Sequence, residues 1–240
     1  MIYKRDFFVG ANDIDYSLNI KDKAILKYLE EIAGLHSDLA GYGLNDIERT
    51  KITWLVLGWK VEVLRRPKYA EEFSINTWCK TQNKLYSKRD FEVLDKDGNI
   101  IIKATSKWLM INTETREIGK IPPEFAIAYG EEDIDVFENT PNFKFKEPNE
   151  QEKVLEYTIT EGWIDFNQHV HNTKYIDLAI KALPENVKEQ NFNNFEIMYK
   201  KEIKLGEKVN LYYALEDGVN IVVIKSEDDK ILHSIIKFYN

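Results

Sequence analysis

Two segments of the chain carry apolar residues at the spacing of a helix that buries one side. Within each segment these residues recur three or four positions apart, which places their side chains on a single helical face. They are Ile25, Leu29 and Ile32 in the first segment, and Ile176, Ala179, Ile180 and Leu183 in the second. Asp22 and Asn172 stand just ahead of these runs, so we expect them to be the N-terminal caps of two helices.

The stretches after each predicted helix alternate between apolar and polar residues and are rich in β-branched side chains. In "FEVLDKDGNIIIKATSKW" and "IVVIKSEDDKILHSIIKF", alternating runs flank a polar turn, Asp97-Gly98-Asn99 in one and Asp228-Asp229 in the other. Alternation at every second residue is typical of strands, and short polar turns join antiparallel neighbours. Each stretch is therefore predicted to be a β-hairpin.

The two halves of the chain match each other at fixed offsets, which indicates an internal duplication. Asp15 aligns with Asp165 (165 − 15 = 150) ahead of the helices, and Glu71 aligns with Glu207 (207 − 71 = 136) after them. The smaller second offset predicts extra residues in the first copy, and "HSDLAGYGLNDIERTKI" is the expected insertion. One helix followed by antiparallel strands in each half predicts an α+β fold, with a sheet packed around each helix.

The stretch between the two halves, 131–152, is rich in charged and turn-forming residues. Such a composition is typical of a connection between folded units. The predicted organisation is therefore an N-terminal unit at 1–130, a linker at 131–152 and a C-terminal unit at 153–240.

The charge balance and the lack of long apolar runs disfavour several classes of protein. The chain has 33 Lys and Arg against 41 Asp and Glu, a net charge of −8, which disfavours binding to nucleic acid or to anionic membranes. No run of about 18 apolar residues occurs, and the start "MIYKRDFFVGANDID" does not read as a secretory signal, so we expect a cytoplasmic protein. The single cysteine, Cys79, excludes an intramolecular disulfide, and its alternating surroundings predict a buried structural thiol.

The stretch "WIDFNQHVHNTKY" places Asp165, Asn167 and His169 at every second position. Asp and Asn oxygens often accept hydrogen bonds near a helix start, so these residues could form a turn that caps the next helix. The first copy has Asp15, Ser17 and Asn19 at the matching positions, so it keeps the acid and lacks the imidazole. That difference favours a single reactive site in the second half.

Other residue patterns narrow the chemistry further. The second imidazole of this stretch, His171, could by composition serve equally well as the functional one. The chain has four histidines without a spaced Cys/His cluster or an HExxH pattern, so we expect no metal and no cofactor. It also lacks a GxSxG elbow, a P-loop and a GxGxxG run, which argues against serine-hydrolase and nucleotide chemistry.

Together, "DFNQHVHNTKYIDLAI" and "IMYKKEIKLGEKVNLYY" resemble the plant and bacterial acyl-acyl carrier protein (ACP) thioesterases. The second half of those enzymes carries an Asp-x-Asn-x-His-Val-Asn-Asn-x-x-Tyr signature and, about three dozen residues later, Tyr-(Lys/Arg)-(Lys/Arg)-Glu-(Cys). Further similarity runs through "WLVLGWKVEVLRRPKYAEEFSINTW" and "ATSKWLMINTETREIGKIPPE", so the resemblance covers essentially the whole chain. It implies a tandem (double) hotdog fold, in which two long helices are each wrapped by an antiparallel sheet. It also implies hydrolysis of fatty acyl-ACP, which releases free fatty acid and terminates chain elongation.

The resemblance assigns site residues one by one. Asp165, Asn167 and His169 match the signature, and Glu202 of "YKKEI" matches the acidic position. Two positions depart from the family: His171 stands where Asn is usual, and Ile203 stands where the plant enzymes have Cys. A cysteine nucleophile at that position is therefore impossible in this chain.

The expected chemistry follows from these residue types. Glu202 would activate water or attack the thioester directly, and His169 would share proton handling. Asn167 would hold the water or the carbonyl, and Asp165 would orient this row through hydrogen bonds. The N-terminus of the helix that begins near Thr173 would suit the developing oxyanion.

Weaker expectations concern the rest of the substrate. Apolar residues of the first unit are candidates to line an acyl tunnel, although each could equally be ordinary core; they are Ile25, Leu29, Ile32, Trp54, Val56 and Leu57. Carrier proteins are acidic, so basic clusters are candidate docking residues: Arg65, Arg66, Lys68, Lys200, Lys201 and Lys204. The alternatives left open are an acyl-CoA thioesterase of the same fold and a non-catalytic acyl-binding protein. Either a monomer or a homodimer is compatible with a tandem fold.

Overall fold

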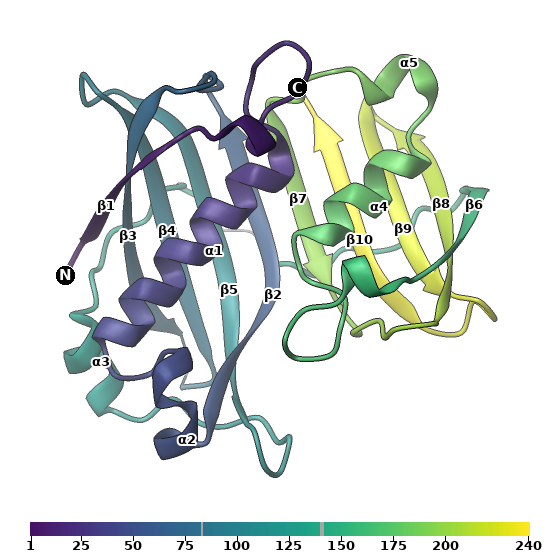
Figure 1. Ribbon diagram of the computed structural model, residues 1–240. Coiled ribbons are helices and arrows are strands. Elements are labelled where there is room, and N and C mark those ends of the chain that lie inside the picture. Colours follow the sequence, from purple (N-terminus) through teal and green to yellow (C-terminus); the bar gives the residue numbers. More distant parts are fainter. Residues whose placement is uncertain (83, 140–141) are drawn as a thin grey trace. The chain divides into compact units, whose positions relative to one another are not determined.

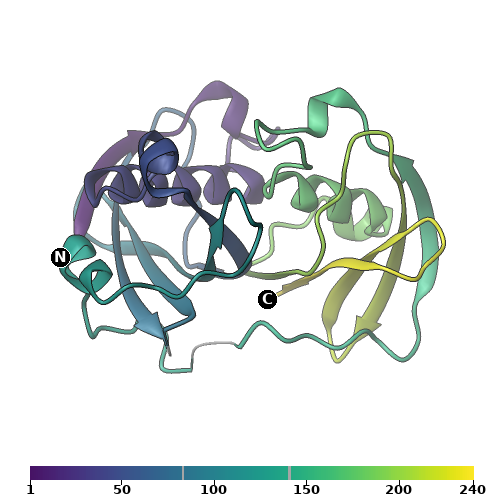
Figure 2. The same cartoon turned by 90° about the horizontal axis from the view of Figure 1, so that it is seen from below.

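The computed structural model describes residues 1–82, 84–139 and 142–240. The chain divides into two compact units, which we call unit 1 (Met1–Asn142) and unit 2 (Phe143–Asn240). Each unit consists of one principal helix laid across a five-stranded antiparallel sheet (Figure 1). Seen from below, the sheet of each unit curves around its own helix (Figure 2).

Unit 1 is built around α1 (Asp22–Leu39), a helix of 18 residues. Its strands are β1 (Tyr3–Phe8), β2 (Ile52–Val63), β3 (Glu72–Gln82), β4 (Tyr86–Asp95) and β5 (Ile100–Asn112). They pair in the order β1-β3-β4-β5-β2, and every neighbouring pair is antiparallel. Shorter elements complete the unit: η1 (Ala11–Asp13), η2 (Leu44–Asp46), α2 (Ile47–Thr50) and α3 (Glu124–Tyr129).

Unit 2 repeats this plan around α4 (Lys174–Ala182), a helix of 9 residues. Its strands are β6 (Glu152–Thr158), β7 (Asn194–Tyr199), β8 (Lys208–Glu216), β9 (Val219–Ser226) and β10 (Leu232–Tyr239). They pair in the order β7-β10-β9-β8-β6, again with every neighbouring pair antiparallel. Two short helical elements, η3 (Glu161–Trp163) and α5 (Glu185–Lys188), lie outside the sheet.

Comparison of the two units confirms the duplication predicted from the fixed offsets. Strand by strand, β2-β5-β4-β3-β1 of unit 1 corresponds to β7-β10-β9-β8-β6 of unit 2. The predicted insertion corresponds to the longer C-terminal part of α1 together with η2 and α2. The tandem hotdog is therefore confirmed, with a second helix half as long as the first.

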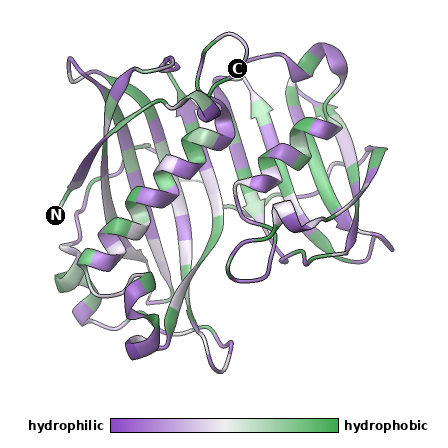
Figure 3. Ribbon diagram, in the orientation of Figure 1, coloured by the Kyte–Doolittle hydropathy of each residue, from purple (hydrophilic) through white to green (hydrophobic). Residues whose placement is uncertain are grey.

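Both helices present an apolar face to their own sheet, as the spacing predicts. Ile25, Leu29 and Ile32 of α1 are buried, and so are Ile176 and Ala179 of α4. Hydrophobic and hydrophilic residues are interspersed along α1, which is how a helix with one buried face looks when coloured by residue (Figure 3).

The two predicted helix caps are each wrong by one residue. Lys21 precedes α1 and Thr173 precedes α4 at the cap positions. Asp22 is instead the first helical residue, and its carboxylate accepts a hydrogen bond from Arg66 at 2.7 Å. Asn172 contributes its backbone carbonyl, which accepts a hydrogen bond from the hydroxyl of Tyr199 at 3.0 Å.

The predicted hairpin turns are confirmed. The β4–β5 turn closes with a hydrogen bond from Asp95 N to Asn99 O at 3.0 Å, and Gly98 within it has a φ of +84°. A positive φ is readily adopted by glycine because it has no Cβ. The β9–β10 turn closes with a bond from Ser226 N to Ile231 O at 2.9 Å.

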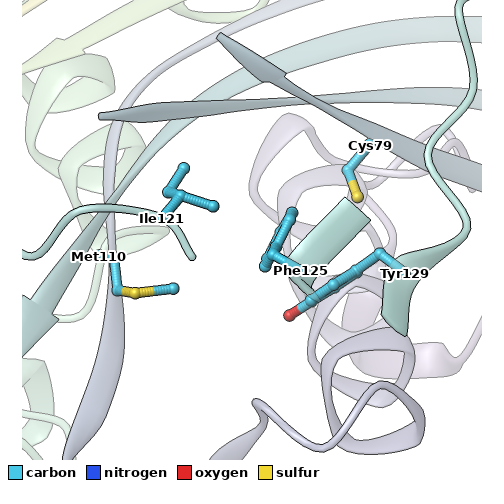
Figure 4. Close-up of a cluster of buried hydrophobic side chains, with 5 residues drawn as sticks. All are labelled: Cys79, Met110, Ile121, Phe125 and Tyr129. Carbon is cyan, nitrogen blue, oxygen red and sulfur yellow. The ribbon is translucent and has the colours of Figure 1, made fainter. Parts of the chain in front are cut away.

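The predicted buried thiol is confirmed as well. Cys79 packs in unit 1 with the buried side chains of Met110, Ile121, Phe125 and Tyr129 (Figure 4). Burial raises the pKa of Cys79 to about 11, which keeps the thiol protonated and unreactive at neutral pH.

A buried histidine at the end of α1 was not singled out by the sequence. His36 is fully buried, its Nδ1 lies 2.9 Å from Nη1 of Arg89, and its ring stacks on Tyr3 at 5.2 Å between centroids. Burial, reinforced by the charges of Arg89 and the chain N-terminus, lowers the pKa of His36 from 6.5 to about 3. The imidazole is therefore neutral in the folded protein at physiological pH.

The predicted linker, 131–152, contains the boundary between the units at Asn142. Its first part is held on unit 1: Nε1 of Trp78 donates to the carbonyl of Ile134 at 2.8 Å, and Lys88 pairs with Asp135. Within unit 2, Lys225 pairs with Glu147 at 2.5 Å. Residues 140–141 of this stretch lie outside the described residues. Among the described residues, no helix has the length and apolar character needed to cross a membrane.

Candidate active site

The loop that begins at Asp165 is shaped by the carboxylate of that residue. Its Oδ1 accepts hydrogen bonds from the backbone N–H groups of Asn167, at 2.8 Å, and His169, at 3.4 Å. The loop closes through Asp165 N and His169 O at 2.9 Å, and Gln168 has a φ of +67°. Short polar side chains commonly stabilise such turns by accepting backbone bonds two to four residues ahead.

Unit 1 contains the same loop without the imidazole. Oδ1 of Asp15 accepts from the N–H groups of Ser17, at 2.8 Å, and Asn19, at 3.0 Å. Leu18, the counterpart of Gln168, has a φ of +63°. The carboxylate therefore shapes the loop in both units.

His169 and Glu202 meet because their backbone segments pair. An isolated β-bridge joins His169 to Lys204, and Val170 N donates to Ile203 O at 2.8 Å. In such antiparallel pairing, a residue and its diagonal neighbour two positions along project on the same face. Glu202 is that diagonal neighbour, and its Oε1 lies 3.1 Å from Nε2 of His169.

The His169–Glu202 pair is partly accessible. The side chain of His169 is 19% exposed and that of Glu202 is 29% exposed. When Nε2 carries the proton it donates to the carboxylate, so the two groups share one hydrogen bond. An imidazole and a carboxylate in such contact can move protons for a bound reactant.

The matching positions of unit 1 hold a different pair. Asn19 bridges Lys68, as His169 bridges Lys204, and Arg66 stands where unit 2 has Glu202. The guanidinium of Arg66 turns to the carboxylate of Asp22 at 2.7 Å and to the carbonyl of Ile20 at 2.9 Å. Burial raises the pKa of Asp22, and Arg66 opposes that rise. The same frame therefore carries a structural ion pair in unit 1.

The second histidine of the loop supports the start of α4. Nδ1 of His171 lies 3.0 Å from the hydroxyl oxygen of Thr173 and accepts the Thr173 backbone N–H at 3.3 Å. Neutral His171 then carries its proton on Nε2. Of the two histidines, His169 is therefore the one in contact with the acid.

Two tyrosines that the sequence reasoning left without a role support the site. The ring of Tyr175, which is buried, packs edge-on against Tyr199 at 5.2 Å between centroids. Burial raises the pKa of Tyr175 above its ordinary value; a backbone hydrogen bond from Ile203 opposes the rise, and the nearby charge of Glu202 adds to it. Tyr175 and Tyr199 each lie in one of the two segments that resemble the family, so their places in those segments could have identified them.

The remaining predicted catalytic residue, Asn167, lies on the same loop with an exposed side chain. Its backbone N–H is used by Asp165. The helix predicted to begin near Thr173 does begin there, with Lys174 as its first residue. Within the described part of the chain, no group of three or more His, Cys, Asp or Glu side chains is placed to hold a metal ion.

The predicted docking residues differ in their availability. The side chain of Arg66 is only 9% exposed and is paired with Asp22. Arg65 is bound to Glu71 at 2.7 Å and to Asp95 at 3.4 Å. The others are exposed: Lys68, Lys200, Lys201 and Lys204.

The predicted acyl-lining residues all lie in the interior of unit 1 or at its margin. Ile25, Leu29, Ile32 and Val56 are buried. The remaining two are half-buried on β2: Trp54 packs against the ring of Phe125, and Leu57 lies at a β-bulge between Val56 and Gly58.

Comparisons with known proteins identify the family of the chain. Residues 1–129 match the family model of the acyl-ACP thioesterase N-terminal domain, and residues 146–238 match that of the C-terminal domain. The oleoyl-acyl carrier protein thioesterase 2 of Arabidopsis thaliana is 26% identical over 204 residues, which cover 77% of this chain and 55% of that protein. The dodecanoyl-[acyl-carrier-protein] hydrolase of Cinnamomum camphora is 26% identical over 232 residues, which cover 91% of this chain and 60% of that protein. The chain thus spans little more than half the length of these relatives.

A solved structure shares the fold over nearly the whole chain. The crystal structure of an acyl-ACP thioesterase from Bacteroides thetaiotaomicron superposes with a TM-score of 0.85, covering 99% of this chain and 97% of that one, at 24% identity. The two family models together leave only the chain end and the segment around the unit boundary unmatched. The chain therefore belongs to the acyl-ACP thioesterase family.

Proposed function

We propose that the protein hydrolyses the thioester of fatty acyl-ACP, which releases free fatty acid and ends chain elongation. The observation that carries this proposal is the contact between His169 and Glu202 at 3.1 Å. It occurs on a loop frame that unit 1 repeats with Asn19 and Arg66 instead. Unit 1 has the same loop without this pair, so the shape of the loop does not require it.

In the proposed reaction, water attacks the thioester carbonyl while Glu202 accepts a proton from it. Glu202 could alternatively attack directly and form an anhydride that water then cleaves. When water attacks, Glu202 passes the accepted proton to His169 through their hydrogen bond, and His169 delivers it to the thiolate that departs as the carbon–sulfur bond breaks. When Glu202 attacks, protonated His169 supplies that proton and recovers one from the water that cleaves the anhydride. The products are a fatty acid and the free thiol of the carrier.

Other groups of unit 2 would position the reactants. Asn167, with an exposed amide on the same loop, would hold the water or the carbonyl oxygen. Asp165 fixes the loop through its two backbone hydrogen bonds. The N-terminus of α4 carries the positive end of the helix dipole, which suits the negative oxygen of the tetrahedral intermediate.

The acyl chain is proposed to contact the apolar interior of unit 1, including the inner face of α1 and the β2 residues predicted above. The relatives are named for different acyl groups, oleoyl in one and dodecanoyl in another. Similarity to both therefore assigns no chain length to this protein. A cytoplasmic location and a monomeric or homodimeric state stay predictions from the sequence.

The test is the release of free fatty acid from matched acyl-ACP and acyl-CoA substrates of several chain lengths. Preferred turnover of acyl-ACP, lost in His169→Ala and in Glu202→Gln, is the expected result. Asn19→Ala is the matched control, because Asn19 occupies the position of His169 in unit 1. Better turnover of acyl-CoA would keep the hydrolysis and reject the carrier-protein substrate. Binding of acyl groups without release by any form would leave the acyl-binding protein as the better account.

A further inference from the structure

The segment that carries Glu202 also presents a group of exposed cations. Lys200, Lys201 and Lys204 are exposed side chains within five consecutive residues. Among the described residues, none of these three ammonium groups forms an ion pair with a carboxylate. In a chain of net charge −8, three unpaired cations beside the candidate active site are a local reversal of charge.

The corresponding turn of unit 1 shows that the turn does not need a free cation at the position of Lys201. In both units a glutamate closes the turn: Oε2 of Glu71 accepts from Lys68 N, and Oε2 of Glu207 accepts from Lys204 N, each at 3.0 Å. Arg65, which matches Lys201 at the same offset of 136, is bound by Glu71. The cation at this position is thus neutralised in unit 1, as Arg65, and unpaired in unit 2, as Lys201.

Two exposed apolar side chains lie on the same pair of segments. Phe166 is 66% exposed and Leu205 is 53% exposed. Leu205 directly follows Lys204, which bridges His169, and Phe166 lies between Asp165 and Asn167 on the paired loop. Apolar groups surrounded by unpaired charge are typical of a surface that binds another protein.

We propose that Lys200, Lys201, Lys204, Phe166 and Leu205 form the docking surface for an acidic carrier protein. The surface rests on the proposed function, because its purpose is to deliver an acyl thioester to His169 and Glu202. Three flexible lysines and two apolar side chains suit the broad acidic face of a protein. A phosphate group, by contrast, is best held by donors that converge on one point, such as an arginine fork or a helix N-terminus.

Complementary charge at the rim of an interface mainly accelerates association and makes it sensitive to salt. The triple variant Lys200→Glu, Lys201→Glu, Lys204→Glu should therefore raise the KM for acyl-ACP at low salt by about tenfold or more. It should also flatten the salt dependence of kcat/KM. Lys96→Glu, at an exposed lysine of the β4–β5 turn, is the control for charge reversal at a lysine outside this surface.

The experiment measures two quantities on the full chain. The first is the ratio of kcat/KM for acyl-ACP to kcat/KM for the matching acyl-pantetheine, which lacks the carrier protein. The second is binding of fluorescently labelled holo-ACP, which needs no turnover. A tenfold fall in the ratio and loss of holo-ACP binding in the triple variant, but not in Lys96→Glu, is the expected result.

Three outcomes would overturn the docking surface. One is an unchanged ratio with unchanged holo-ACP binding in the triple variant. The second is an equal loss of turnover for acyl-ACP and acyl-pantetheine, which would mean damage to the reaction itself. The third is a specific loss of acyl-CoA turnover, which would assign the lysines to phosphate. If the wild-type protein hydrolyses none of these thioesters, the proposed function fails, and the holo-ACP titration still decides the docking surface by itself.

Discussion

Replacing Asp165 or Asp15 by alanine separates the contribution of the loop to stability from its contribution to catalysis. Each carboxylate accepts two backbone hydrogen bonds, at 2.8 and 3.4 Å for Asp165 and at 2.8 and 3.0 Å for Asp15. Both side chains are half-buried. The two substitutions therefore remove nearly the same interactions from the two units.

The size of the effect follows from these bonds. Removing a side-chain oxygen that caps backbone N–H groups typically costs about 0.5–2 kcal/mol. Because the second bond of Asp165 is long, we expect Asp165→Ala to lower the free energy of unfolding by about 1–2 kcal/mol. We expect Asp15→Ala to lower it by the same amount or slightly more, because both of its bonds are short.

The two variants should differ in turnover. A displacement of about 1 Å in a catalytic group can lower the rate about 10²-fold, so Asp165→Ala should lower kcat by about 10–10²-fold. Asp15→Ala should keep kcat within about twofold of the wild type, because its loop carries no imidazole and rate effects of loop displacement require a reacting group. Asp165→Asn, which retains an oxygen acceptor, should recover most of the lost rate.

Urea unfolding followed by tryptophan fluorescence measures the first quantity, and release of free thiol from acyl-ACP measures the second. Wild-type kcat in Asp165→Ala would refute a positioning role for this residue. Equal losses of kcat in both alanine variants would refute the assignment of the chemistry to unit 2 alone.

Further substitutions test other parts of the structure. Glu202→Gln and His169→Ala should each lower kcat about 10²–10⁴-fold. The double variant should lose little more activity than either single variant, because the two groups act as a unit. If the two losses multiply fully in stopped-flow turnover, the two residues do not act jointly. His171→Asn should preserve activity and melting temperature, since an Asn oxygen can accept the Thr173 N–H, whereas His171→Leu should destabilise the protein by about 1 kcal/mol in the same melts. Burial lowers the pKa of His36 from 6.5 to about 3, so as the pH falls the unfolded chain protonates this imidazole before the folded protein does. The stability that neutral His36 contributes to the folded state is therefore present above pH 6.5 and is lost as the pH falls toward 3. The fall in melting temperature between pH 7 and pH 4.5 should accordingly be smaller in His36→Gln, and an identical fall would contradict this origin of acid sensitivity.

The sequence was most informative where local pattern decides structure. Helical spacing predicted the inner faces of α1 and α4, and the offset between Asp15 and Asp165 predicted two corresponding segments. In the structure these segments are loops with matching hydrogen bonds. Sequence pattern was less informative where distant residues meet. The pairing of Arg66 with Asp22 joins positions 44 residues apart, and no local pattern distinguishes such a buried cation from an exposed lysine.

The helix starts failed for a related reason. Asn172 has a residue type that favours a cap, but its neighbour His171 already binds the Thr173 N–H, and its own carbonyl is taken by Tyr199. Which of several competent side chains caps a helix depends on the tertiary contacts of each. His169 and Glu202 were assigned to one site only through the family resemblance, because no local pattern connects them. They lie on separate segments that pair through the β-bridge between His169 and Lys204, and there their side chains meet.

In the loop frame that the two units share, the position that holds Glu202 in unit 2 holds a structural cation, Arg66, in unit 1. At the candidate site positions, unit 1 has Ser17 in place of Asn167, Asn19 in place of His169 and Arg66 in place of Glu202. Under the proposed function, two equivalent loops can thus differ in chemistry through these side chains alone, while the hydrogen-bonded backbone frame is the same. Arg66 then converts the vacated position into an anchor for the first turn of α1. Under the proposed function, unit 2 therefore carries the reaction on the same backbone frame that unit 1 uses for packing.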